Sequence, residues 1–312
     1  MIYISKMKVK SFCIIFVLFS LISCKTNYVR IGDKDANYIP YYLKVYEADS
    51  LFLSGNYFHS YSILDSLFKK YEPLNMTLYF EYENYLKSAV ILKKINKVKF
   101  KKIILNYGYN YSNLKKDSLL NIALVNSNFN EKKIKRFHES YVKKLDTVFR
   151  KKLGNMNAED QRVRNMKPYD KNIVSITDSI HNSIFKEYIL SVGFPSDKKI
   201  GTFRKLSSND NNNFSLDLFF NHMSYGGDYE FFKEKLFFFV KNGTCSPRIY
   251  AMMVDRWHID KTNKSFYHIL SLDENWKMDE EFVKKINYRR FQIGLPSVEY
   301  QDFWYKKRIL NY

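Results

Sequence analysis

The sequence is poor in the residues that mark covalent or catalytic chemistry. It contains three cysteines among 312 residues, and because Cys245 is the only one after residue 24, the rest of the chain cannot form an internal disulfide. Cys245 lies in a turn-like segment without a neighbouring base, which favours a structural thiol. Phosphate-binding glycine loops, dinucleotide fingerprints and the Gly-x-Ser-x-Gly pattern are absent. We therefore expect no cofactor and no metal ion, and we assign the chain to no common enzyme class.

The chain also lacks an apolar run of the length that a permanent membrane span needs. Residues 12–22 are uncharged and apolar but fall short of roughly 20 residues, and three lysines precede them, as in a cleavable signal segment. The end of this run, Leu21-Ile22-Ser23-Cys24, resembles the lipobox of bacterial lipoproteins. The resemblance implies that residues 1–23 are removed and that Cys24 carries fatty acyl chains, such as palmitate, which anchor the chain to a lipid bilayer. The alternative is an ordinary secretory signal with an unmodified Cys24.

The residues after Cys24 bear on the location that this resemblance implies. Lys25 stands where an aspartate retains some lipoproteins in the inner membrane, which favours the outer membrane. Residues 25–28 contain none of the acids that often follow the cysteine of surface-exported lipoproteins, which favours the periplasmic face. We expect residues 24–40 to form the lipidated cysteine and a short tether that ends at Pro40.

The formal charge is +19, and removal of the three signal lysines lowers it to +16. Lysines and arginines are scattered along the chain instead of forming one dense arm, and no nucleic-acid-binding motif accompanies them. We interpret most of them as ordinary surface residues and expect no nucleic-acid partner. Attraction to anionic lipids or cell-wall polymers is the alternative.

Residues 41–153 contain a pattern that resembles tetratricopeptide helix pairs. Small residues, Ala48 and Ser60, stand where two antiparallel helices approach each other, Gly55 marks the turn between them, and Pro73 stops the second helix. A weaker second pair spans 78–107, and further helices are expected over 118–125 and over 134–153, the last ending at Gly154. The resemblance implies a helical domain that binds a protein partner through residues 41–153.

Residues 154–312 are predicted to form a second, mostly helical domain. Helical patterns cover 173–191, 214–223 and 229–241, and Asp279 has the position of an N-cap for a later helix. Residues 254–270 are expected to form the end of a helix and then a small β-hairpin that turns at 260–263. The predicted fold class is therefore mainly α, with tetratricopeptide-like helical hairpins followed by a second helical domain and at most one β-hairpin.

Several short patterns between residues 155 and 300 resemble, in the same order, an uncharacterised bacterial domain of unknown function. One departure is the segment 265–268, which keeps only the tyrosine of a Gln-x-Tyr-Gly pattern. The resemblance implies a domain boundary and no reaction. Its positions are Asp160, Gln161, Arg164, Asp178, Asn182, Gly193, Pro195, Gly201, His222, Asp255, Arg256, Arg289, Arg290, Gly294 and Leu295.

Four of these residues are the first candidates for chemistry: His222, Asp255, Arg256 and Arg290. A histidine beside an aspartate and an arginine is able to transfer protons next to a bound anion. However, Arg290 follows Ile286 by four residues and shares its apolar helix face. A buried structural contact between Asp255 and an arginine explains that position without a substrate.

The sequence leads to three hypotheses. The leading one is a lipid-anchored, non-enzymatic envelope protein that binds or scaffolds a protein partner. The second is an envelope hydrolase with a site around His222 and Asp255. The third is electrostatic attachment to an anionic wall or lipid surface.

Overall fold

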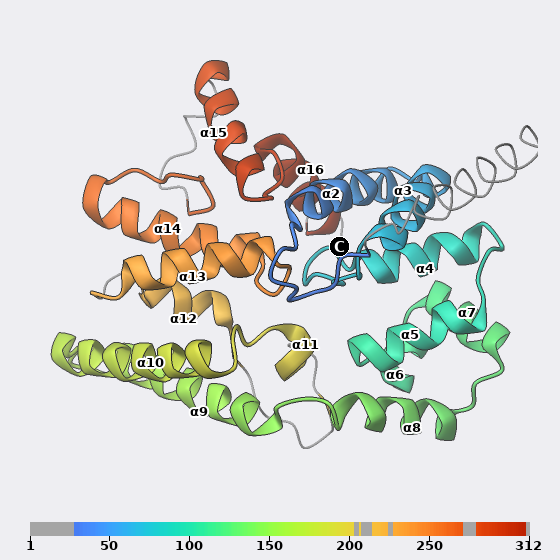
Figure 1. Ribbon diagram of the computed structural model, residues 1–312, viewed down its shortest axis with the longest axis horizontal. Coiled ribbons are helices and arrows are strands. Elements are labelled where there is room, and N and C mark those ends of the chain that lie inside the picture. Colours follow the sequence, from blue (N-terminus) through green and yellow to red (C-terminus); the bar gives the residue numbers. More distant parts are fainter. Residues whose placement is uncertain (1–27, 203–205, 207–213, 224–226, 271–278, 310–312) are drawn as a thin grey trace, which may run out of the picture.

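The computed structural model describes residues 28–202, 206, 214–223, 227–270 and 279–309, and these residues form helices joined by loops (Figure 1). No strand occurs among them, although Val29 makes one isolated parallel bridge with Tyr71. The mainly α fold class is thus confirmed. Within the described ranges, no helix combines the length and apolar character of a membrane span. The predicted signal and Cys24 lie outside the described residues.

The first part of the chain contains short helices. They are α2 (Ile39–Leu53), α3 (Tyr57–Lys70), α4 (Glu81–Ile91), α5 (Lys97–Tyr107), α6 (Tyr111–Lys116), α7 (Ser118–Ser127) and α8 (Glu131–Val142). The second part adds α9 (Thr147–Arg164), α10 (Lys171–Ser191), α11 (Asp197–Ile200), α12 (Leu216–His222), α13 (Tyr229–Lys241), α14 (Pro247–Thr262), α15 (Glu280–Gln292) and α16 (Val298–Arg308).

The predicted first helix pair is present as α2 and α3. Gly55 has a positive φ of 80° in the turn between them, and the side chain of Asn56 caps α3 by accepting the backbone N–H of His59. Ala48 and Ser60 are fully buried, as expected of small residues where two helices pack closely. The helix pair is therefore confirmed, while its assignment to the tetratricopeptide class stays a prediction.

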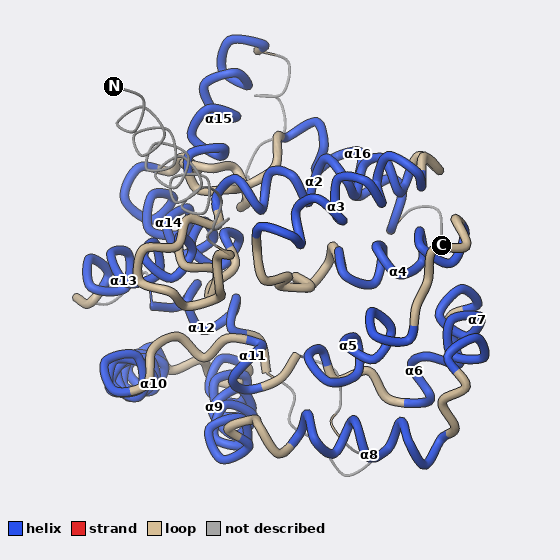
Figure 2. The backbone as a smooth tube through the Cα atoms, turned by 45° about the vertical axis from the view of Figure 1, so that its right-hand side comes forward, coloured by secondary structure: helices blue, strands red, loops and turns tan. Residues whose placement is uncertain are grey.

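The helices follow a closed path, so that the last ones return to the first (Figures 1 and 2). Helices α15 and α16 both pack against α2. A single cluster of buried apolar side chains runs from Ala36 to Leu295. Both halves of the sequence therefore contribute to one core around α2, although their division into two domains at residue 153 stays a prediction.

The segment before α2 is packed against the helices. The N–H of Val29 donates to the carbonyl of Lys70 (2.8 Å), and the N–H of Glu72 donates to the carbonyl of Val29 (2.8 Å). Tyr38 is fully buried. The tether predicted over residues 24–40 is therefore too long, because the chain belongs to the fold from Val29 onward.

Two helix boundaries differ from the prediction. The helix predicted over 134–153 is two helices, α8 and α9, and α9 continues through Gly154 to Arg164. They separate at residues 143–146, where the Asp146 side chain accepts the N–H of Phe149 and begins α9. A side-chain cap at Asp146, and no glycine or proline, thus sets the boundary.

The small β-hairpin predicted within 254–270 was also wrong. Helix α14 continues to Thr262, so the expected turn at 260–263 falls within and just after a helix. Residues 264–270 form a loop, and the backbone N–H groups of this loop bind a side chain of α14 in place of a second strand.

Candidate functional site

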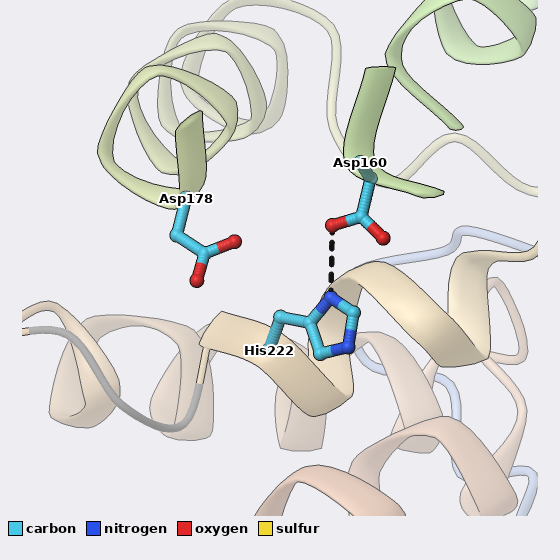
Figure 3. A group of neighbouring side chains, drawn as sticks. All are labelled: Asp160, Asp178 and His222. Carbon is cyan, nitrogen blue, oxygen red and sulfur yellow. Dashed lines mark hydrogen bonds and ion pairs between the residues drawn. The ribbon is translucent and has the colours of Figure 1, made fainter. Parts of the chain in front are cut away.

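Three side chains from three helices meet beside α12: Asp160 of α9, Asp178 of α10 and His222, the last residue of α12 (Figure 3). The Nδ1 atom of His222 lies 3.0 Å from Oδ1 of Asp160. One ligand-type atom from each residue falls within 4.8 Å of the others. The sequence placed Asp160, Asp178 and His222 among its family-like positions but did not place them together.

Arg164 connects the two carboxylates of this cluster. It stands one turn after Asp160 on α9, its Nη2 donates to Asp178 Oδ1 (2.5 Å), and its Nε lies 3.3 Å from Asp160 Oδ1. Nε also lies 3.2 Å from His222 Nδ1. His222 Nδ1 accepts the N–H of Arg164 in one tautomer and, when it carries the proton itself, donates to Asp160. The contact between Arg164 and Asp160 is an ion pair.

The electrostatics of the cluster centre on Asp160, whose side chain is almost fully buried. Burial by itself raises the pKa of this carboxyl, but the hydrogen bond from His222 and the charges of His222 and Arg164 outweigh it and hold the pKa below its usual value. Gln161 adds a further donor to Asp160 Oδ2 (2.9 Å). Asp160 is thus an ionised acceptor inside a network that is already satisfied.

This arrangement limits the chemistry of the site. Two carboxylates and an imidazole are common metal ligands, but here the Arg164 guanidinium supplies the positive charge and is bonded to both carboxylates. A metal ion would have to displace it. An Asp–His pair is also a general-base arrangement, yet neither Asp160 nor His222 lines either of the two best-formed cavities of the described chain. The contacts are those of a polar joint between α9, α10 and α12.

Asp255 belongs to a different cluster. Its side chain is fully buried, and its two oxygens accept four backbone N–H groups of the following loop, those of Phe266 (2.8 Å), Tyr267 (2.5 Å), Ile269 (2.7 Å) and Leu270 (3.2 Å). Asp255 therefore shapes this loop, and the predicted pairing of Asp255 with His222 does not occur: each of them is bonded to other groups.

Arg290 holds the same loop from the other side. This fully buried guanidinium donates to the carbonyls of Pro296 (2.6 Å) and Tyr267 (3.0 Å) and to the side chain of Gln301 (2.5 Å). Desolvation lowers the pKa of Arg290 to about 10. Asp255 and Arg290 are thus joined through the Tyr267 backbone, and their burial and contacts are structural.

The remaining predicted positions also have structural contacts. Arg256 donates to the side chain of Asn221 (3.2 Å), and the Arg289 guanidinium lies over the Phe266 ring at 4.4 Å. Gly193 and buried Pro195 follow the end of α10. Gly294 has a φ of 79°, and a Cβ there would stand 2.6 Å from the Tyr42 ring.

One feature missed by the sequence analysis is an apolar strip on the outer face of α10. Ile176, Ile180 and Leu190 are 61%, 54% and 67% exposed, and their spacing places them on one side of the helix. The buried face of α10 contains another apolar set that includes Phe185 and Ile189. An amphipathic pattern was visible in the sequence, but which apolar residues remain exposed depends on the packing of α10 against α9.

Comparison of the chain with family models, curated proteins and solved structures finds no match. The resemblances to a lipobox protein, to tetratricopeptide repeats and to a domain of unknown function therefore remain predictions.

Proposed function

We propose that the chain is a lipid-anchored protein of the bacterial envelope that binds a protein partner through the outer face of α10. The observation that carries the proposal is the exposed pair Ile176 and Ile180, one turn apart on α10, with exposed Leu190 further along the same face beyond Ser183 and Glu187. Exposed apolar patches of this kind are typical of protein interaction sites, and a partner helix with its own apolar stripe fits a row of this spacing. The partner surface thus differs from the one expected within residues 41–153.

The packed segment at Val29 limits the distance between the fold and a lipid anchor at Cys24. Only residues 25–28 separate Cys24 from the fold, and an extended chain spans at most about 3.5 Å per residue. A lipid on Cys24 would therefore hold the fold within roughly 17 Å of the bilayer surface. The exposed basic residues in this region, Arg30 and Lys34 among them, alternate with Asp33 and Asp35, so this region gives little support to the alternative of a purely electrostatic attachment.

Site-specific cross-linking tests the partner surface. A photoreactive residue at position 180 of the membrane-bound chain should yield a discrete adduct, whereas one at position 148, where Val148 is 81% exposed on α9, should not. Adding Ile176→Glu and Leu190→Glu should remove the adduct. Absence of an adduct at position 180, or an adduct that persists in the double variant, contradicts the proposal.

A second experiment tests the anchor by itself. Cys24→Ser should abolish fatty acyl labelling and move the chain from the membrane fraction to the soluble fraction, while Cys245→Ser should leave both unchanged. Unaltered labelling of Cys24→Ser contradicts lipidation of this cysteine, whatever the result with the α10 strip.

A further inference from the structure

One well-formed cavity of the described chain lies inside the closed path of helices, where the N-terminal segment meets α11, α12 and α14. It has a volume of about 440 Å³. Figures 1 and 2 show α11 between the N-terminal helices and the helices of the second half. The apolar wall is made by Met76, Phe194, Leu216 and Ile249 among others. A cavity of this size, mostly apolar and with a few polar groups, is typical of small-molecule sites.

Asp197, the first residue of α11, lines this cavity, and the positive charge that acts on it is that of Arg150. The carboxylate accepts one hydrogen bond, from the Thr77 hydroxyl at 3.3 Å. Asp197 is exposed to solvent as well as lining the cavity. Desolvation, with the nearby charge of Asp217, raises the pKa of Asp197 to about 6. Near neutral pH the cavity therefore presents a carboxylate with room for further donors.

The cations that line the same cavity are already next to acids. Lys198 Nζ lies 2.7 Å from Glu72 Oε1, and Arg248 Nε lies 3.7 Å from Asp217 Oδ2. Helix α14 also begins here, but its capping residue, Ser246, accepts the N–H of Arg248. The under-neutralised group in the cavity is thus negative, which favours a positively charged ligand over an anion.

We propose that this cavity binds a small organic amine, with the ammonium group on the Asp197 carboxylate and the apolar body against Phe194 and Ile249. The volume suits a ligand with one aromatic ring or a short aliphatic chain. This site is separate from the α10 strip and from the Asp160 cluster, so it does not depend on the proposed protein partner.

Calorimetric titration of the full-length chain with 2-phenylethylamine tests the proposal, with 2-phenylethanol and phenylacetate as probes of the same body and different charge. The amine should bind and the other two should bind at least about tenfold more weakly, because a charge-assisted hydrogen bond is lost. Asp197→Asn should weaken amine binding by a similar factor. The control, Asp35→Asn, changes an exposed aspartate outside the cavity and should leave amine binding unchanged.

The pH dependence gives a readout that does not require a variant. The charged and titratable groups around Asp197 are Arg150, Asp217 and Tyr141, besides the paired Lys198. Amine affinity should fall as the pH decreases through about 6, since protonation of Asp197 removes the acceptor charge. Equal binding of the alcohol and the amine, full affinity in Asp197→Asn, or no amine binding at low millimolar concentration overturns the proposal.

Discussion

Tyr300 of α16 donates a hydrogen bond to Asp49 of α2 at 2.6 Å, across 251 positions of sequence. The same carboxylate also accepts from Asn84 of α4 (2.8 Å) and Arg308 of α16 (2.8 Å). Asp49 is nearly fully buried. One carboxylate thus joins the returning helix α16 to two helices of the first half.

Tyr300→Phe tests this joint. Removing the hydroxyl leaves one Asp49 oxygen without its donor and should lower the free energy of unfolding by about 1–2 kcal/mol. Urea denaturation measures the change. The matched control is Tyr288→Phe on α15, because Tyr288 is 67% exposed, and its stability should stay within about 0.5 kcal/mol of the parent. Equal stability of both variants would show that the Asp49 contact contributes little.

Asp255→Ala should be among the most destabilising substitutions in the chain. It leaves four loop N–H groups without their acceptor, and we expect a loss of about 3 kcal/mol or more. Asp260→Ala, at an exposed position of the same helix, serves as the control. Thermal melting of the two variants measures this structural role, because a side chain without such contacts should be replaceable with little loss of stability.

The Asp160 cluster should make stability depend on acid pH. The pKa of Asp160 is held below the usual 3.8 in the folded chain. The contribution of Asp160 to the free energy of unfolding is therefore fully present above pH 3.8 and is lost as the pH falls through the lower folded pKa. Chemical denaturation from about pH 7 to about pH 2 should therefore show a difference between the parent and Asp160→Asn that is constant above about pH 4 and shrinks below it. A constant difference between the two curves would falsify this assignment.

Alanine substitutions at Gly294 and Gly55 test the close approach of Gly294 to Tyr42, with Gly55 as the control. Both have φ near 80°, but a Cβ at Gly294 would stand 2.6 Å from the Tyr42 ring, and a Cβ at Gly55 would meet nothing within 4 Å. Alanine at Gly55 should cost about 1 kcal/mol of backbone strain, and alanine at Gly294 should cost distinctly more in urea denaturation. Similar losses would mean that Tyr42 moves aside freely.

The sequence predicted the elements better than their contacts. Helix α13 has the predicted bounds, Tyr229–Lys241, because an apolar helical pattern coincides with breaks at both ends. The boundary at Asp146 was missed, although aspartate favours N-cap positions, because no glycine or proline stands near it to mark the end of the preceding helix. The loop after α14 was misassigned because its backbone donors bind Asp255, a partner that only the folded chain supplies.

In the candidate sites too, the sequence predicted local contacts but not contacts between distant segments. Asp160 and Arg164 are four residues apart, so their adjacency on one helix was predictable. Their contacts with Asp178 and His222 depend on how α9, α10 and α12 pack, which no local pattern specifies. Asp197 had no distinguishing signal in the sequence, because its role depends on the cavity that distant segments enclose.

The early packing of Val29 has a consequence for the order of events in the cell. If Cys24 is processed as proposed, the bond that is cut lies close before Val29, which is hydrogen-bonded to Lys70 and Glu72 in the folded chain. We expect that modification and cleavage precede these hydrogen bonds and those of Gly32 and Tyr38 with Asn242 and Lys241 at the end of α13. Folding would then compete with processing, and a chain that folded before cleavage would retain residues 1–23.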